Sequence, residues 1–141
     1  MTYVKKVLCI MALAALAGCG MMGGGSSGKT VNVSLSGGEE VPPVSASGSG
    51  KGSFTIGNDG SVRGSVSTSG VQGTMAHIHR GAKGQNGPIV VPLTKSGDTY
   101  TAPANAKLSE ADLQAFREGR LYVNVHTDRN KGGEVRGQLN P

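Results

Sequence analysis

The feature that most constrains the fold is a series of short segments in which apolar and polar residues alternate. Val31, Val33 and Leu35 are separated by polar residues, which is the period of a strand with one buried face. Similar segments cover residues 53–56, 61–67, 74–79, 99–102, 121–127 and 134–139. The Gly-Asn-Asp-Gly run at 57–60 and the 24 glycines of the chain indicate tight turns between neighbouring strands. The sequence therefore predicts an all-β fold, an antiparallel sandwich or barrel with Greek-key-like connections.

One helix interrupts this pattern. Ser109 is a favourable N-cap, and Asp112 three residues later places an acid close to where a capping box needs it. Leu113 and Phe116 have the i, i+3 spacing of one apolar helix face, and Gly119 is suited to the position after the last turn. We expect a short amphipathic helix that caps one end of the sheet.

The N-terminal region has the pattern of an export signal. Lys5 and Lys6 precede an apolar stretch at 7–17 that is too short for a stable membrane anchor. It ends in Leu-Ala-Gly-Cys (16–19), which resembles the lipobox of bacterial lipoproteins. This predicts a lipoprotein signal peptide at 1–18, a lipidated Cys19 with a flexible Gly/Ser tether at 19–29, and a single domain at 30–141. The alternative is an ordinary secretory signal, cut nearby.

These assignments leave the mature domain without a thiol, because Cys9 lies in the signal and Cys19 carries the lipid. The expected location is the cell envelope, where the lipid on Cys19 attaches the protein to a membrane and the domain faces the periplasm or the cell surface. Gly20 follows the cysteine instead of an inner-membrane retention aspartate, which favours the outer membrane in a Gram-negative cell. Other envelope proteins are the expected partners.

Charge and composition argue against two function classes. Removing residues 1–18 takes away two of the 14 basic residues and none of the nine acidic ones, which lowers the formal net charge from +5 to +3. The remaining cations are scattered and the chain has no Trp, so a nucleic-acid surface is not expected. No activated nucleophile or acid–base pair is recognisable either, and we expect a protein that is not an enzyme.

All three histidines of the chain lie in two short segments, and they are the strongest indication of chemistry. Met75, His77 and His79 alternate along one predicted strand and share a face, and His126 on a neighbouring strand could complete the cluster. Thioether and imidazole donors favour copper, with zinc as the less favoured metal. The alternative is that the imidazoles hydrogen-bond the glycine-rich loop 81–88 to the sheet, and that Met75 is a core residue.

Three further polar residues are candidates for a second layer around this site. Glu134 and Arg136 alternate on the last strand, where Glu134 is placed to orient a ligand imidazole. Asn124 lies two residues before His126 and is placed to hydrogen-bond a ligand. The alternatives are a cross-strand ion pair between Glu134 and Arg136, and an Asn124 that caps a loop.

Two motifs resemble signatures of a known family. Ala-His-Ile-His-Arg-Gly (76–81), followed by Gly-Gln-Asn-Gly-Pro (84–88), is similar to the first signature of the CHRD (chordin-type) domain. Tyr-Val-Asn-Val-His-Thr (122–127), followed by Gly-Glu-Val-Arg-Gly-Gln (133–138), is similar to the second. The resemblance implies a binding module with no enzymatic activity attached to it.

The two histidine strands also look remotely like the copper ligands of Cu/Zn superoxide dismutase. No fourth histidine is present to bridge two metals, so dismutase activity is not expected. Two function hypotheses follow: an exported, lipid-anchored copper-binding protein, and a structural or adhesive interaction module that holds no metal.

Overall fold

The computed structural model describes residues 27–141 of the chain. The predicted signal peptide (1–18), the predicted lipid on Cys19 and most of the predicted tether lie outside these described residues. Strand β1 already begins at Gly28, so Gly28 and Lys29, which we assigned to the tether, belong to the folded domain. No helix within residues 27–141 is long and apolar enough to cross a membrane.

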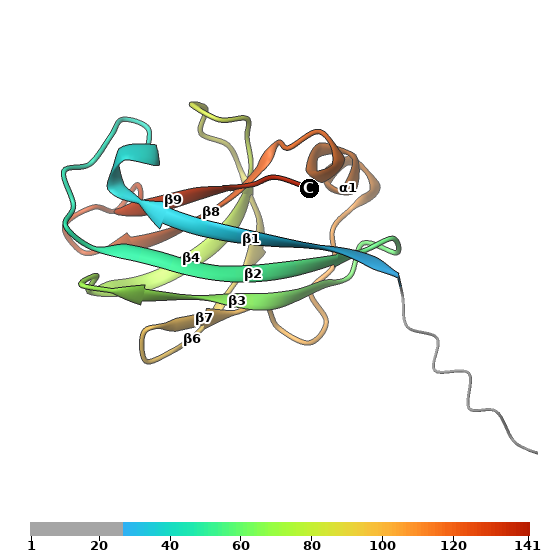
Figure 1. The fold of residues 1–141 in the computed structure, drawn as a ribbon, viewed down its shortest axis with the longest axis horizontal. Coiled ribbons are helices and arrows are strands. Elements are labelled where there is room, and N and C mark those ends of the chain that lie inside the picture. The colour runs from blue at the N-terminus through green and yellow to red at the C-terminus, as the bar shows by residue number, and fades with distance from the viewer. Residues whose placement is uncertain (1–26) are drawn as a thin grey trace, which may run out of the picture.

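The described residues form one antiparallel sheet in the order β5-β4-β8-β9-β1-β2-β3-β7-β6 (Figure 1). Several neighbours are far apart in sequence: β1 pairs with β9, β4 with β8 and β3 with β7. These crossovers bring the two histidine segments side by side. The strands are β1 Gly28–Ser36, β2 Ser49–Gly57, β3 Val62–Ser69, β4 Gly73–Arg80, β5 Ile89–Pro92, β6 Thr94–Ser96, β7 Thr99–Thr101, β8 Leu121–Thr127 and β9 Val135–Leu139, and a 3-10 turn, η1, covers Gly37–Glu39.

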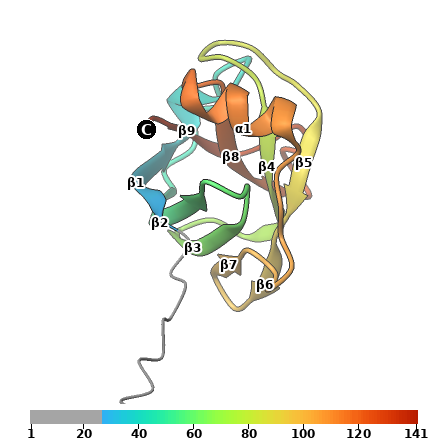
Figure 2. The same cartoon turned by 90° about the vertical axis from the view of Figure 1, so that its right-hand side faces the viewer.

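The sheet curls around a single apolar core until its two ends meet, as the end-on view in Figure 2 shows. The amide of Leu93, between β5 and β6, donates to the carbonyl of Ala76 on β4 at 3.0 Å and links the two edges. The core consists of the inward-facing residues of each strand, for example Val33, Phe54 and Val123. This confirms the predicted all-β antiparallel fold and makes it a nearly closed barrel.

Two strands, β5 and β6, were not expected from the sequence. They are short, and β5 is bounded by Pro88 and ends at Pro92. Proline lacks the amide donor of a strand ladder and is tolerated only at edges. Both strands are edge strands here, which is where such a sequence is accommodated.

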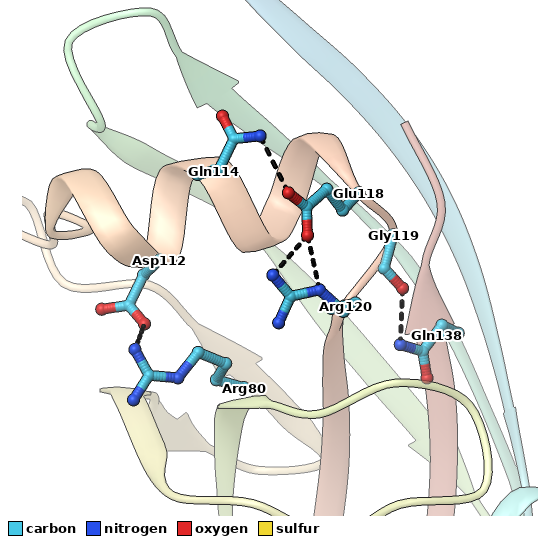
Figure 3. A network of polar contacts seen from close by, with 7 residues as sticks. All are labelled: Arg80, Asp112, Gln114, Glu118, Gly119, Arg120 and Gln138. Atoms are coloured by element: carbon cyan, nitrogen blue, oxygen red, sulfur yellow. Dashed lines mark hydrogen bonds and ion pairs between the residues drawn. The ribbon is translucent and has the colours of Figure 1, made fainter.

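The expected helix is α1, Glu110–Arg117. Ser109 caps it by accepting a hydrogen bond from the amide of Asp112 at 3.1 Å, and Gly119 follows the last turn with φ +68°. Figure 3 shows how the helix is attached: Asp112 pairs with Arg80 at the end of β4 (3.0 Å), and the Gly119 carbonyl accepts from Gln138 of β9 (2.8 Å). The helix therefore covers one end of the barrel, as predicted, and is attached to β4, which carries two of the histidines, and to β9.

The outer face of β8 and β9 and of the second half of β4 is largely covered by loops, whereas the start of β4 is exposed. Every residue of β8 is buried, although alternate side chains point away from the core. Loop 81–88 lies against this face and is joined to the chain after η1 by Asn86, whose amide donates to the Val41 carbonyl at 2.7 Å. A second buried region, the polar interior, therefore lies between this face of the sheet and the loops that cover it.

Candidate metal centre

The three histidines meet in this polar interior. Ala76 and Ile78 of β4 point into the core, so His77 and His79 point outward. In the register of β4 and β8, Met75 faces His126 and His77 faces Asn124. One potential ligand atom from each of the three imidazoles lies within 4.8 Å of the other two, and the closest pair is His77 Nδ1 and His126 Nε2 at 3.1 Å. The convergence on which the metal hypothesis depends is therefore present.

Backbone carbonyls orient two of the rings. His79 Nδ1 donates to the Gly87 carbonyl at 3.0 Å, and His126 Nδ1 donates to the Lys131 carbonyl at 2.8 Å. A carbonyl only accepts, so both rings carry their proton on Nδ1 and keep the lone pair on Nε2. Nε2 of His79 is buried and has no hydrogen-bond partner. Fixing one ring nitrogen on a carbonyl so that the other is free is the arrangement found around metal-ligating histidines.

The spacing can be compared with that of a bound ion. Three nitrogens at about 2.0–2.1 Å from one metal lie roughly 3.3–3.6 Å apart. The His77–His126 separation of 3.1 Å is close to this value, but it is a hydrogen bond in which His77 Nδ1 donates to His126 Nε2, so an ion there would take the place of this proton. The widest separation in the cluster, up to 4.8 Å, exceeds the value by about 1 Å. Metal binding would therefore require a small inward movement of one imidazole, within the reach of a side-chain rotation.

Burial keeps the rings in the form that binds metal. Desolvation, and then the nearby His126 and His79, lower the pKa of His77 to about 4. The pKa of His79 is also lowered, mainly by burial. A metal displaces a proton from a charged imidazole but needs none displaced from a neutral one. These two histidines are thus available as ligands at neutral pH.

Met75 lies at the solvent side of the cluster. It is 51% exposed and faces His126 across the strand pair. The alternative interpretation, a core residue, does not fit this exposure. No contact places its sulfur on the three nitrogens, so its part in the site stays a prediction.

The three predicted second-layer residues have different positions. Glu134 accepts from Thr127 Oγ1 (2.7 Å) and from Asn130 Nδ2 (3.1 Å). These bonds shape the turn whose Lys131 carbonyl holds His126, so a carbonyl, and not Glu134, is the group seen on that imidazole. Asn124 donates to the Gly132 carbonyl at 3.2 Å in the same turn.

Arg136 holds the other loop of the site. Its guanidinium donates to the carbonyls of Ala82 (3.1 Å) and Gln85 (2.9 Å) and to Asn86 Oδ1 (3.2 Å). It also lies 3.4 Å over the ring of Tyr122, which stacks on His79 with ring centroids 4.9 Å apart. Among the described ion pairs none joins Arg136 to Glu134, and the function of Arg136 is to fix loop 81–88.

Glu40 belongs to the same interior and was not anticipated from the sequence. It follows η1, is only 4% exposed, and has a carboxylate oxygen, Oε1, without a hydrogen-bond partner. Burial raises its pKa to about 7, although Asn124 and Arg136 act in the opposite direction. No alternation or motif connects residue 40 with the histidine strands, so no sequence signal marks it.

The raised pKa of Glu40 predicts a pH-dependent stability difference. The unfolded carboxyl ionises near its ordinary value of 4.5 and the folded one near 7, so the folded state loses stability as pH rises from about 4.5 to 7. Glu40→Gln removes this cost. We expect the metal-free variant to gain up to about 3 kcal/mol over the wild type at pH 8, with little of that gain at pH 5, measured by urea unfolding.

The control is Glu39→Gln, which removes the same charge from the neighbouring residue. Glu39 pairs with Lys83 at the surface, so its replacement removes a charge without removing a buried carboxylate, and the gain in stability at pH 8 should be absent. An equal effect of Glu40→Gln at pH 5 and pH 8 would contradict the prediction.

The fold and the site together define a class of protein: an antiparallel barrel with a three-histidine cluster on its outer face, covered by loops. The family model of the CHRD domain matches residues 31–139. The chain belongs to the CHRD domain family, as the two motifs indicated. Searches of curated proteins and of solved structures returned no match.

Proposed function

We propose that the chain is an exported, lipid-anchored CHRD protein that binds one transition-metal ion, copper by preference, in the cell envelope. His77, His79 and His126 are the ligands. The protein carries, buffers or stores the ion and catalyses no reaction. The observation that carries the proposal is the convergence of the three imidazoles, two of them oriented by the Gly87 and Lys131 carbonyls.

Copper is preferred over zinc because of the donors. Neutral imidazoles suit both metals, but the order of affinities for divalent ions favours Cu(II). The exposed thioether of Met75, across from His126, adds a soft donor that suits Cu(I). The proposed lipid anchor rests on the Leu-Ala-Gly-Cys run at 16–19. An anchored domain would have the membrane and neighbouring envelope proteins as its partners.

The test is a titration of the purified, chelator-stripped chain with copper and, separately, zinc. We expect one copper ion per chain, a weaker affinity for zinc, and a gain in stability of about 2.7 kcal/mol when free copper is a hundredfold above its Kd. Calorimetry and thermal melting measure both quantities. Unchanged melting with copper would overturn the proposal and favour the structural or adhesive module.

A further inference from the structure

Three buried polar atoms without partners lie around one another on the outer face of the barrel. They are Glu40 Oε1, Asn124 Oδ1 and His79 Nε2. Because His79 donates through Nδ1 to Gly87, its Nε2 is an acceptor, as are the amide oxygen and an ionised carboxylate. Each unpaired buried group costs about 1–3 kcal/mol. Unpaired acceptors beside the three imidazoles are suited to a cation and its bound water.

Asn124 connects the other two residues. It faces His77 in the register of β4 and β8, and it precedes His126 by two residues on β8, so both side chains lie on the same face of the sheet. Gly133 confirms that Glu40 and Asn124 are close together, because a Cβ at this glycine would collide with Glu40 Oε1 and with Asn124 Nδ2. Asn124 therefore lies between Glu40 and the histidine cluster.

The charge balance of the site also involves Glu40. The three imidazoles carry no negative charge, and the buried guanidinium of Arg136, 1% exposed, already places a cation on this face. A second cation there is opposed by Arg136 unless an anion is close by. Glu40 is the buried carboxylate among residues 27–141, and its charge interacts with Arg136. It is placed to offset the added charge of a metal ion.

We propose that Glu40 is part of the metal centre: Asn124 lies between it and the histidines, and its carboxylate supplies the negative charge that favours Cu(II) over Cu(I). The inference rests on the proposed function, since it concerns the same three histidines. It adds a residue from a distant segment of the chain and assigns the site a preference between two oxidation states. A divalent ion gains more from a nearby carboxylate than a monovalent ion does.

The test compares Glu40→Gln with wild type and with Glu39→Gln, at the half-buried neighbour that pairs with Lys83. The affinities for Cu(II) and for Cu(I), the latter kept reduced without oxygen, are measured by competition with chelators of known affinity. We expect Glu40→Gln to weaken Cu(II) binding about tenfold or more and Cu(I) binding distinctly less. The ratio of the two affinities therefore falls, and Glu39→Gln leaves it unchanged. The ratio does not depend on the fraction of protein that is folded, so a loss of stability cannot imitate the effect.

Two further variants test the connection through Asn124. Glu40→Asp keeps the charge and should restore part of the Cu(II) preference. Asn124→Ala should weaken Cu(II) binding, and combining it with Glu40→Gln should cost less than the sum of the two. If wild type binds copper but Glu40→Gln leaves the ratio unchanged, the role of Glu40 is overturned and the proposed function stands. If wild type binds no copper, the proposed function itself is overturned.

Discussion

A chain that carries both His77→Ala and His126→Ala is expected to bind no copper and to melt at the same temperature with and without it. These two residues provide the closest pair of nitrogens, 3.1 Å apart, and they come from two different strands. Their removal leaves His79 as a single imidazole, which cannot hold an ion against water on its own. The stabilisation of about 2.7 kcal/mol expected for wild type at a hundredfold excess over Kd should disappear.

The single variants separate ligation from folding. Each should retain two imidazoles and bind copper more weakly than wild type, while keeping the near-wild-type secondary structure that circular dichroism measures. A matched control, Asn32→Ala/Lys51→Ala, replaces two exposed strand residues outside the cluster and should bind copper as wild type does. Uptake of one copper ion by the histidine double variant would place the metal elsewhere and remove the three-histidine centre.

The strands that carry the histidines were predictable because one periodicity determines both fold and site. In β4 the apolar residues Ala76 and Ile78 must face the core, which forces His77 and His79 to the other face. The pairing of β4 with β8 was not predictable from periodicity, since three strands and a helix lie between them in the chain. The family motifs linked the two segments, and the register then placed His126 beside them.

The surroundings of the histidines were harder to predict. The groups that orient His79 and His126 are the carbonyls of Gly87 and Lys131, and every residue type has a carbonyl. Glu134 was a candidate to orient an imidazole, with an ion pair to Arg136 as the alternative, but its hydrogen bonds go to Thr127 and Asn130. Loop conformation, which side-chain periodicity does not encode, decides these contacts. Glu40 reaches the site from such a loop as well.

Replacing Arg136 with alanine is expected to cause the largest loss of stability of any single substitution considered. The guanidinium is buried and satisfies three acceptors of loop 81–88, on Ala82, Gln85 and Asn86. Alanine removes the donor from the Gln85 carbonyl and from Asn86 Oδ1, whereas the Ala82 carbonyl keeps the Gln85 amide at 3.0 Å. It also leaves the buried Glu40 without the cation that acts on it. Removing one member of a buried, hydrogen-bonded charge network costs about 3–5 kcal/mol. Urea unfolding of the metal-free chain measures this loss.

Copper binding should weaken in the same variant, because loop 81–88 presents the Gly87 carbonyl that orients His79. Arg136→Lys separates charge from geometry: it keeps the cation near Glu40, but a single ammonium lacks the planar fork that reaches several acceptors together. An intermediate loss is therefore expected. Arg129→Ala, at an exposed arginine of the turn after β8, should change neither stability nor affinity by a measurable amount. A loss below about 1 kcal/mol for Arg136→Ala would mean that the loop is held by its other contacts, and the polar interior would then have to form without this guanidinium.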